Sequence, residues 1–365
     1  MRLEAVVTSE VVEKTLRGKG RGSRFFVLGR PVWERLLSAK TTNRLNLILT
    51  FLTLLAGTGS DHRLSKWSAK ACEECLGLGR PRARLAIQEL IAAGLIEMGP
   101  LATKLSPQYL LPSVGDEVDP IFIPVQAVTG FGGEAPMFRR VRETGDWLIL
   151  RMLIDLYGLV QVDQTYGVPL GHLRQGKEGS GGTKISEMGV HAIWALNLDQ
   201  TQSGAGDWVQ AHYEKAASKP WATFWLRVKT LQEIGALWFE PWLFDGEDWD
   251  AEPLFPVDFS ILYTRQAPDD VAELSQLVAD TAQELLEGRE YLLEGHGADL
   301  AVPLPLHHRA PAIRGVAKLR IEADTPGCRM AYARRKGAIE RWQKAYSQLL
   351  NDAKVGRYDR PLGAP

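Results

Sequence analysis

The order of apolar and polar residues predicts a series of short helices in the first third of the chain. Residues 45–56 are almost entirely apolar and Gly57 follows them, which predicts a buried helix ending at this glycine. The preceding stretch, "RFFVLGRPVWERLLSAK", predicts a short strand and a helical turn that starts at a proline. A second short helix is expected in "SKWSAKACEECLGLG", where Gly77 and Gly79 would end it.

A third helix is predicted to begin at Pro81, because a proline at the first helical position loses no hydrogen bond. Ala83, Ile87 and Leu90 recur at i, i+4 and i+7 and form one buried stripe. After Gly94, the residues "LIEMGPLATKLSPQYLLP" predict two short strands about a Gly-Pro turn.

Residues 41–112 resemble the winged helix-turn-helix of bacterial DNA-binding proteins. The resemblance is sharpest in "LGLGRPRARLAIQELIAAGLI", which is similar to the turn, recognition helix and first wing strand of many bacterial regulators. It implies that the start of the third helix enters a major groove, where arginine can pair with guanine or bind phosphate. The alternative is that the arginines only solvate an exposed face. The residues expected to contact DNA here are Lys66, Lys70, Arg80, Arg82, Arg84 and Gln88.

The segment "RGKGRGSR" adds a basic, glycine-rich arm. A glycine-rich arm has no fixed geometry for reading bases, so phosphate contacts are expected until it orders in a minor groove. Its basic residues are Arg17, Lys19, Arg21 and Arg24.

Residues 143–262 contain a fainter copy of the same pattern. "ETGDWLILRMLIDLYGLV" predicts an amphipathic helix, and "SKPWATFWLRVKTLQEIGALWFEPWLF" again combines an early proline with an apolar i, i+4, i+7 stripe at Phe224, Val228 and Leu231. The turn "DGEDWD" and the run "PLFPVDF" would complete a wing, with a long insert before the third helix. An unrelated α+β domain is the alternative. The candidate surface for DNA or a protein partner is Lys219, Trp221, Trp225, Arg227 and Lys229, and its tryptophans favour a protein.

Charge is segregated along the chain. Residues 1–110 hold 17 basic and 9 acidic side chains, residues 111–310 hold 14 and 30, and residues 311–365 hold 12 and 5, although the net charge is only −1. Basic ends of this kind indicate nucleic-acid contact. An odd number of cysteines, three, and no long apolar segment predict a soluble protein of the cytoplasm, without a membrane partner.

Enzymatic signatures are incomplete. "GHLRQGKEGSGGT" matches the first elements of a phosphate-binding loop, but Glu178 stands where a serine or threonine should hold magnesium. Cys72 and Cys75 form a single C-x-x-C inside a predicted helix, and the H-x-E at His212 lacks the P-C-x-x-C of zinc deaminases. His307 and His308 fall in the proline-rich segment "VPLPLHHRAP", expected as an exposed loop. We therefore expect no catalytic residues, no metal and no cofactor.

The C-terminal part is predicted to hold an acidic helix in "APDDVAELSQLVADTAQELLEG", a proline-rich linker, a strand in "IRGVAKLRIEAD" and a long basic helix. That last helix could lie on phosphates or dock on the acidic middle of its own chain. Its basic residues are Arg329, Arg334, Arg335, Lys336 and Arg341.

Together these patterns predict a mainly helical α+β protein with two winged-helix-like domains and a basic C-terminal strand-helix segment. The expected divisions are an arm and lead-in (1–40), a winged-helix domain (41–112), a linker (113–142), the second winged-helix-like domain (143–262) and the helical, basic C-terminal region (263–365). Tandem winged helices resemble plasmid and phage replication initiators, which implies non-catalytic binding of double-stranded DNA. The alternatives are a transcriptional regulator, including one of a mobile element, and an assembly scaffold that binds a protein partner or a second copy.

Overall fold

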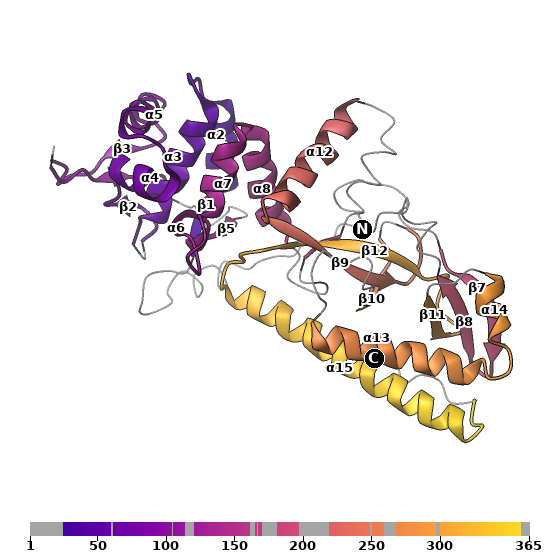
Figure 1. The fold of residues 1–365 in the computed structure, drawn as a ribbon. Helices are drawn as coiled ribbons and strands as arrows, with labels where there is room; N and C mark the ends of the chain where they lie inside the picture. The colour runs from indigo at the N-terminus through magenta and orange to yellow at the C-terminus, as the bar shows by residue number, and fades with distance from the viewer. Residues whose placement is uncertain are drawn as a thin grey trace. The chain divides into compact units, whose positions relative to one another are not determined.

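The computed structural model describes residues 25–59, 61–103, 105–113, 120–160, 165, 167–169, 181–196, 219–248, 250–258, 268–296 and 300–358 (Figure 1). The chain divides into two compact units. Unit 1 takes its residues from Met1–Val160, Thr230–Ala236 and Leu319–Arg329, and unit 2 from Gln161–Lys229, Leu237–Lys318 and Met330–Pro365. Each unit holds both helices and strands, which confirms the expected α+β class.

Unit 1 begins with a strand and continues through helices that alternate with short strands. Its elements are β1 (Phe25–Gly29), α2 (Arg30–Ser38), α3 (Arg44–Ala56), β2 (Leu64–Ser65), α4 (Ala69–Leu76), α5 (Arg80–Ala92), β3 (Glu97–Met98), β4 (Tyr109–Leu110), β5 (Pro120–Pro124), α6 (Gln126–Thr129), α7 (Met137–Thr144) and α8 (Trp147–Leu159).

The ends of the first helices follow from local sequence. The side chain of Asn43 accepts a hydrogen bond from the backbone N–H of Asn46 and starts α3, while Gly57 ends it. Gly77 ends α4 in the left-handed conformation (φ 64°), which a residue with a Cβ adopts only at a cost. The expected helices and the stops at Gly57 and Gly77 are thus confirmed, whereas Gly79 precedes α5 as its N-cap residue.

Three two-residue strands form a small antiparallel sheet in the order β2-β4-β3. Leu64 lies opposite Leu110 on one side of β4, and Glu97 lies opposite the same residue on the other side. Residues 99–108 connect β3 to β4, so the connection is longer than a tight Gly-Pro turn. The resulting order is helix, strand, helix, helix and two strands.

Residues 113–142, which the sequence suggested to be a linker, contribute to unit 1 instead. Strand β5 pairs antiparallel with β1, from Phe25 opposite Pro124 to Gly29 opposite Pro120. This two-stranded ribbon packs against α2, α3 and α8, and Phe25 and Val27 share a small buried cluster with Ala323. A pairing between segments so far apart in sequence leaves no local signature, which is why the pattern missed it.

Unit 2 contains two antiparallel sheets and two long helices. Its elements are β6 (Val168–Pro169), β7 (Thr183–Met188), β8 (His191–Leu196), β9 (Leu237–Phe244), β10 (Pro253–Pro256), α13 (Asp269–Leu285), α14 (Tyr291–Gly295), β11 (Leu300–Pro305) and β12 (Ala312–Leu319). The sheet orders are β10-β9-β12-β6 and β11-β8-β7. Helices α12 (Lys219–Glu233) and α15 (Pro326–Lys354) each contain a boundary between the units.

The first residues of the proline-rich segment expected as a linker, 302–305, belong to the strand β11 (Leu300–Pro305). It pairs with β8 along its full length, with Pro303 opposite Ile193 and Pro305 opposite His191. Because β11 lies at the edge of its sheet, its prolines can direct their missing N–H away from the ladder. His307 and His308 follow β11, and His307 is exposed as expected.

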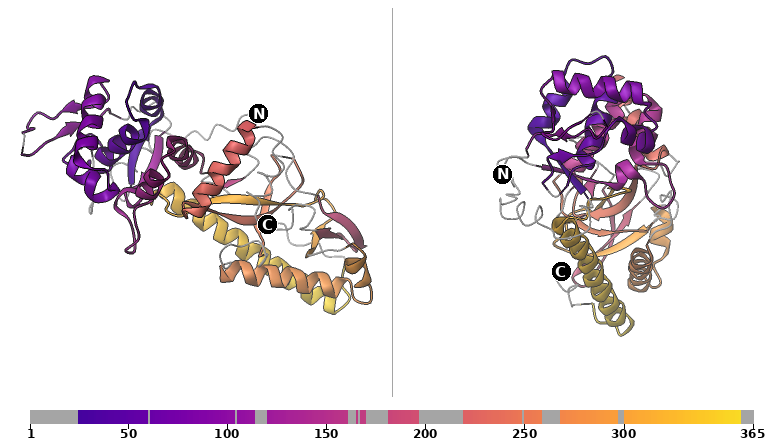
Figure 2. Two further views of the ribbon diagram at one scale, coloured as in Figure 1. Left: turned by 45° about the horizontal axis from the view of Figure 1, so that its top comes forward. Right: turned by 90° about the vertical axis from the view of Figure 1, so that its left-hand side faces the viewer.

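Helices α13 and α15 lie side by side in unit 2 (Figures 1 and 2). The Gln343 side chain on α15 donates to the backbone carbonyl of Asp270 on α13, at 3.1 Å. Phe255 on β10 packs on Trp342 and Tyr346 of α15, and the Tyr346 hydroxyl donates to the carbonyl of Pro303. The C-terminal helix is therefore part of the unit 2 core.

The two units follow other boundaries than the expected second domain, 143–262. Helix α8 belongs to unit 1, whereas α12 begins in unit 2. The hairpin of β9 and β10 forms as expected, but β9 also adjoins β12, from the C-terminal region. Within the described ranges, no helix combines the length and the apolar character needed to cross a membrane.

Candidate nucleic-acid interface

Helix α5 presents one buried and one exposed face. It starts after Gly79, with Pro81 in its first turn, and buries Ala83, Ala86, Ile87 and Leu90. This apolar side packs on α3 and α4 and confirms the expected stripe. The opposite side carries the arginines that the resemblance points to.

Arg82, Arg84 and Gln88 are exposed outside the buried stripe. Among the residues that the structure describes, the side chains of these three have neither a hydrogen-bond nor an ion-pair partner. Leu85 lies among them and is 47% exposed. A guanidinium group without an internal partner stays available for an external anion, and an exposed leucine is available for apolar contact such as a thymine methyl group.

Arg80 and Lys70 are exposed but already paired. Arg80 Nε lies 2.7 Å from Glu73 on α4, and Lys70 Nζ lies 3.5 Å from Glu74. Ion pairs this exposed contribute little to stability, so a phosphate can replace the carboxylate at small cost. Lys66 is exposed in the loop before α4. The arm residues Arg17, Lys19, Arg21 and Arg24 lie outside the described residues.

Glu89 anchors the C-terminal half of α5 to the start of α3. Its carboxylate accepts hydrogen bonds from the hydroxyl of Thr41 (2.6 Å) and from the hydroxyl and N–H of Thr42 (2.8 and 3.1 Å). Desolvation acts to raise the pKa of Glu89, but these hydrogen bonds outweigh it and lower the pKa below the usual value. Arg35 on α2 adds a bond to the carbonyl of Gly94, just after the helix. The exposed arginines thus stand on a helix whose C-terminal half is held by residues before α3 and by α2.

Helix α7 brings two further arginines to the turn between α4 and α5. A methyl group placed on Gly77 in this turn would lie 3.5 Å from Arg142 Nη2 and 3.6 Å from Arg139 Nε. Arg142 Nε also donates to the carbonyl of Leu76, the last residue of α4, at 2.7 Å. Sequence reasoning missed both arginines because their segment resembled a linker. The only available signal was the basic run Arg139, Arg140 and Arg142 on an amphipathic helix.

The connection between β3 and β4 displays apolar side chains. Leu101 is 76% exposed and Leu105 is 99% exposed, and Met98 on β3 is 53% exposed. Lys104, between the two leucines, lies outside the described residues. The described part of this loop therefore shows no cation that would bind phosphate.

The second expected surface is only partly present on α12. Trp225 is fully buried (0% exposed), so it cannot form a surface for DNA or a partner. It joins Val228 and Leu231 on the buried side, while Phe224 is half-buried, because the larger indole takes the core position. Lys219 and Trp221 are exposed, and Arg227 and Lys229 are half-buried.

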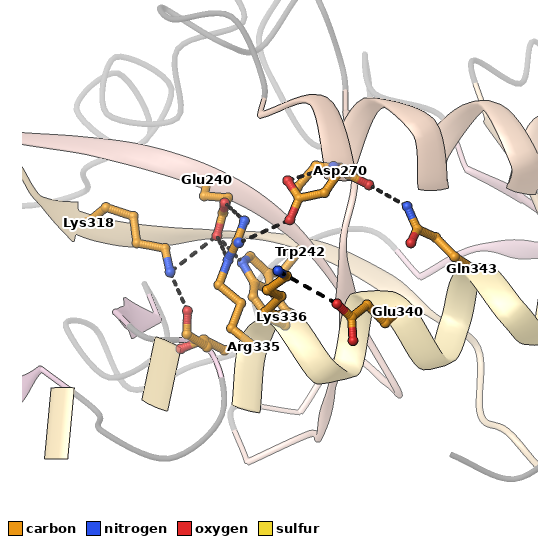
Figure 3. A network of polar contacts seen from close by, with 10 residues as sticks. Glu240, Trp242, Asp270, Lys318, Arg335, Lys336, Glu340 and Gln343 are labelled. Atoms are coloured by element: carbon orange, nitrogen blue, oxygen red, sulfur yellow. Dashed lines mark hydrogen bonds and ion pairs between the residues drawn. The ribbon is translucent and has the colours of Figure 1, made fainter. Parts of the chain in front are cut away.

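Arg335 on α15 docks on the acidic middle of its own chain (Figure 3). Its Nη2 lies 2.5 Å from Glu240 Oε1 on β9, and Lys318 Nζ on β12 lies 3.2 Å from Glu240 Oε2. The Trp242 indole N–H donates to the same carboxylate at 2.7 Å. Burial acts to raise the pKa of Glu240, but Lys318 and Arg335, with the hydrogen bonds, lower it below the usual value.

This cluster joins β9, β12 and α15 inside unit 2. The side chains of Glu240, Lys318 and Arg335 are only 1%, 5% and 8% exposed. The other α15 basic residues are at the surface, where Arg329 pairs with Asp324 and Lys336 with Glu340. Since the carboxylate is already neutralised and closed off from solvent, the cluster has a structural role.

The acidic turn between β9 and β10 is held by arginines. The buried Arg314 donates from Nη2 to the carbonyls of Gly246 and Asp248, and the Arg309 N–H donates to Asp245 at 2.8 Å. Asp245 also lies 3.3 Å from His308 Nδ1. Arg314 thus binds the backbone of this turn from within the unit.

The cysteines are separate free thiols. Cys72 is buried in α4, and burial raises its pKa to about 12. Cys75 is half-buried on the same helix. Among the described residues, no group of three or more His, Cys, Asp or Glu side chains has the arrangement of a metal site. The glycine-rich loop with Lys177 and the H-x-E at His212 lie outside the described residues.

Comparison with known proteins found no match to this chain. No protein-family model matches the sequence, and the searches found no similar curated protein and no similar solved structure. Function therefore has to be inferred from the residues of this chain.

Proposed function

We propose that unit 1 binds double-stranded DNA as a winged helix-turn-helix, with α5 as the recognition helix. The order α3, β2, α4, α5, β3, β4 and the sheet order β2-β4-β3 support this assignment. In helix-turn-helix proteins the second helix of the motif lies in the major groove and reads bases from its N-terminal part. Helix α5 holds that place here.

The observation that carries the proposal is the exposed face of α5. The side chains of Arg82, Arg84 and Gln88 are exposed outside the buried stripe, and the described residues offer them no partner. Arginine pairs bidentately with guanine and glutamine with adenine, while both also bind phosphate oxygens. The anchoring of α5 through Glu89 and its apolar stripe fixes where these side chains start, which favours a geometric readout.

For the biological process we propose origin binding, as in replication initiators, on the strength of the sequence resemblance. Transcriptional regulation is the second candidate. The division of α12 between the two units, with α8 wholly in unit 1, favours this second candidate, because it leaves one clear helix-turn-helix instead of two. A third candidate, an assembly scaffold, loses support because Trp225 is buried.

The first test measures binding of the full chain to a fluorescent duplex of mixed sequence by anisotropy. Affinity should fall steeply between about 0.05 and 0.2 M salt, because each neutralised phosphate releases counterions. The double change Arg82→Ala/Arg84→Ala should weaken binding and reduce the salt slope. The matched control is Arg151→Ala, another exposed arginine of unit 1 (48% exposed), on α8. A folded chain without DNA affinity even at low salt would contradict the proposal.

A second test separates base reading from phosphate binding. On a preferred sequence obtained by in vitro selection, Arg82→Ala should cost roughly 1–3 kcal/mol, with little loss on mixed-sequence DNA. Equal losses on both DNAs would assign Arg82 to phosphate. Genomic occupancy mapping then distinguishes the processes: one repeat array indicates origin binding, scattered promoters indicate regulation, and no enrichment indicates a scaffold.

A further inference from the structure

The turn between α4 and α5 collects positive charge from two parts of the sequence. Arg80 begins α5 on one side of this turn, and Arg139 and Arg142 reach Gly77 from α7. The acidic side chains beside them are Glu73, which pairs with Arg80, and Glu143, which pairs with Arg139 at 3.3 Å and with Arg142 at 3.6 Å. The turn therefore has three arginines beside two glutamates. Arg82 and Arg84, which follow Arg80 at the start of α5, add further positive charge.

The two α7 arginines differ in how much of the side chain is committed. Arg142 is 23% exposed and donates to the Leu76 carbonyl, so it closes the C-terminal end of α4 and fixes α7 on the turn. Arg139 is 45% exposed, and its Nε lies 3.3 Å from Glu143 Oε1, itself 51% exposed. Only Arg139 has an exposed guanidinium group that can exchange its partner.

We infer that Arg139 is a second, sequence-independent contact of the DNA interface, which binds a backbone phosphate beside the groove that α5 occupies. This inference rests on the proposed function. Glu143 holds the guanidinium group in the unbound protein, and a phosphate oxygen replaces the carboxylate in the complex. The exchange is inexpensive because an exposed i, i+4 ion pair contributes little.

A phosphate fits this position better than a base does. Arg139 stands on α7, outside the recognition helix, and the turn beside it carries a glycine, so the guanidinium group lies next to bare backbone. In complexes of DNA-binding proteins, side chains outside the groove-binding element fix the register through phosphates. The contact therefore predicts equal effects on all DNA sequences.

The experiment is a double-mutant cycle on the full chain with the mixed-sequence duplex. Arg139→Ala should weaken binding about 3- to 10-fold near 0.1 M salt and reduce the salt slope by about 0.9. Glu143→Gln should bind about 2- to 3-fold more tightly, because the carboxylate no longer competes with the phosphate for the Arg139 guanidinium group. In the double variant most of that gain should disappear, because the Arg139 guanidinium group that Glu143→Gln would release is absent.

Arg151 and Asp155 provide the matched control pair. They too form an i, i+4 ion pair in unit 1, at 3.5 Å and with 48% and 42% exposure, and Asp155→Asn keeps an oxygen for the Trp33 indole N–H. Neither Arg151→Ala nor Asp155→Asn should change affinity by as much as the α7 variants. A gain in affinity cannot result from unfolding, so Glu143→Gln keeps the inference testable whatever the stability of Arg139→Ala.

The outcomes separate this inference from the proposed function. Losses confined to Arg82→Ala/Arg84→Ala, with Arg139→Ala and Glu143→Gln no different from the α8 controls, would overturn the phosphate contact and leave the α5 interface in place. A wild-type chain that does not bind duplex DNA would overturn both. Sequence-dependent effects of Arg139→Ala would also contradict a phosphate contact.

Discussion

Replacing Arg335 by methionine should destabilise unit 2 strongly, although the other basic residues of its helix are at the surface. The change removes the 2.5 Å contact with Glu240 Oε1 and a second hydrogen bond to Oε2 at 3.4 Å. It leaves a carboxylate that is 1% exposed with Lys318 as its remaining cation. Breaking a buried ion pair by removing one partner costs about 3–5 kcal/mol, and Lys318 should keep the loss near the lower end, about 3 kcal/mol.

The neighbouring residue supplies the control. Lys336 is 61% exposed and lies 3.8 Å from Glu340, so Lys336→Met should cost no more than about 0.5 kcal/mol. Denaturant unfolding measures both losses, and hydrogen exchange in peptides from β9, β12 and α15 locates them in unit 2. Similar small losses for the two variants would refute the reasoning that the Glu240 cluster is a buried, coupled group.

The same cluster predicts a pH dependence. Because the folded protein holds the pKa of Glu240 below its usual value of 4.5, its contribution is present at neutral pH. That contribution is lost as the pH falls through the lowered folded pKa. In Arg335→Met the burial of the carboxyl group is less well compensated and the pKa of Glu240 lies closer to its unfolded value, so unit 2 should lose less stability between neutral and acidic pH than in the wild type.

Three other changes test single features of the fold. Trp225→Ala should cost about 3–5 kcal/mol because it empties a core position, whereas Trp221→Ala, at 43% exposure, should cost less than about 1 kcal/mol in the same denaturant assay. Glu89→Gln should lower the free energy of unfolding by about 1 kcal/mol at neutral pH, where the wild-type carboxylate is charged. The difference between the two proteins should vanish as the pH falls through the lowered folded pKa of Glu89. An unchanged difference at low pH would contradict this. A thiol reagent at mildly alkaline pH should modify Cys75 before Cys72, because a pKa of about 12 keeps the buried Cys72 thiol protonated. After unfolding, the two thiols should react at equal rates. Equal rates in the folded protein would contradict this prediction.

Local sequence was sufficient for most helices and for their ends. The apolar run up to Ala56, the stop at Gly57 and the stripe of Ala83, Ile87 and Leu90 each encode a structure within about four turns of chain. The candidate arginines on α5 follow from the same periodicity, because residues that alternate with a buried stripe must face outward.

What the sequence did not reveal depends on contacts between distant segments. Periodicity reports which side of an element is buried, but it does not name the partner. The strand β5 was therefore read as a linker, and the prolines of β11 hid a strand that only an edge position permits.

The same limit applies to the side chains that matter for function and stability. The sequence by itself determined that α5 would expose arginines and that Arg335 would lie on a basic helix. The tertiary structure decided that Arg139 reaches the turn before α5, that Arg335 is buried on Glu240 and that Trp225 is in the core. The physical reason is that charge and size are properties of one residue, whereas burial and pairing are set by whichever distant segment packs against it.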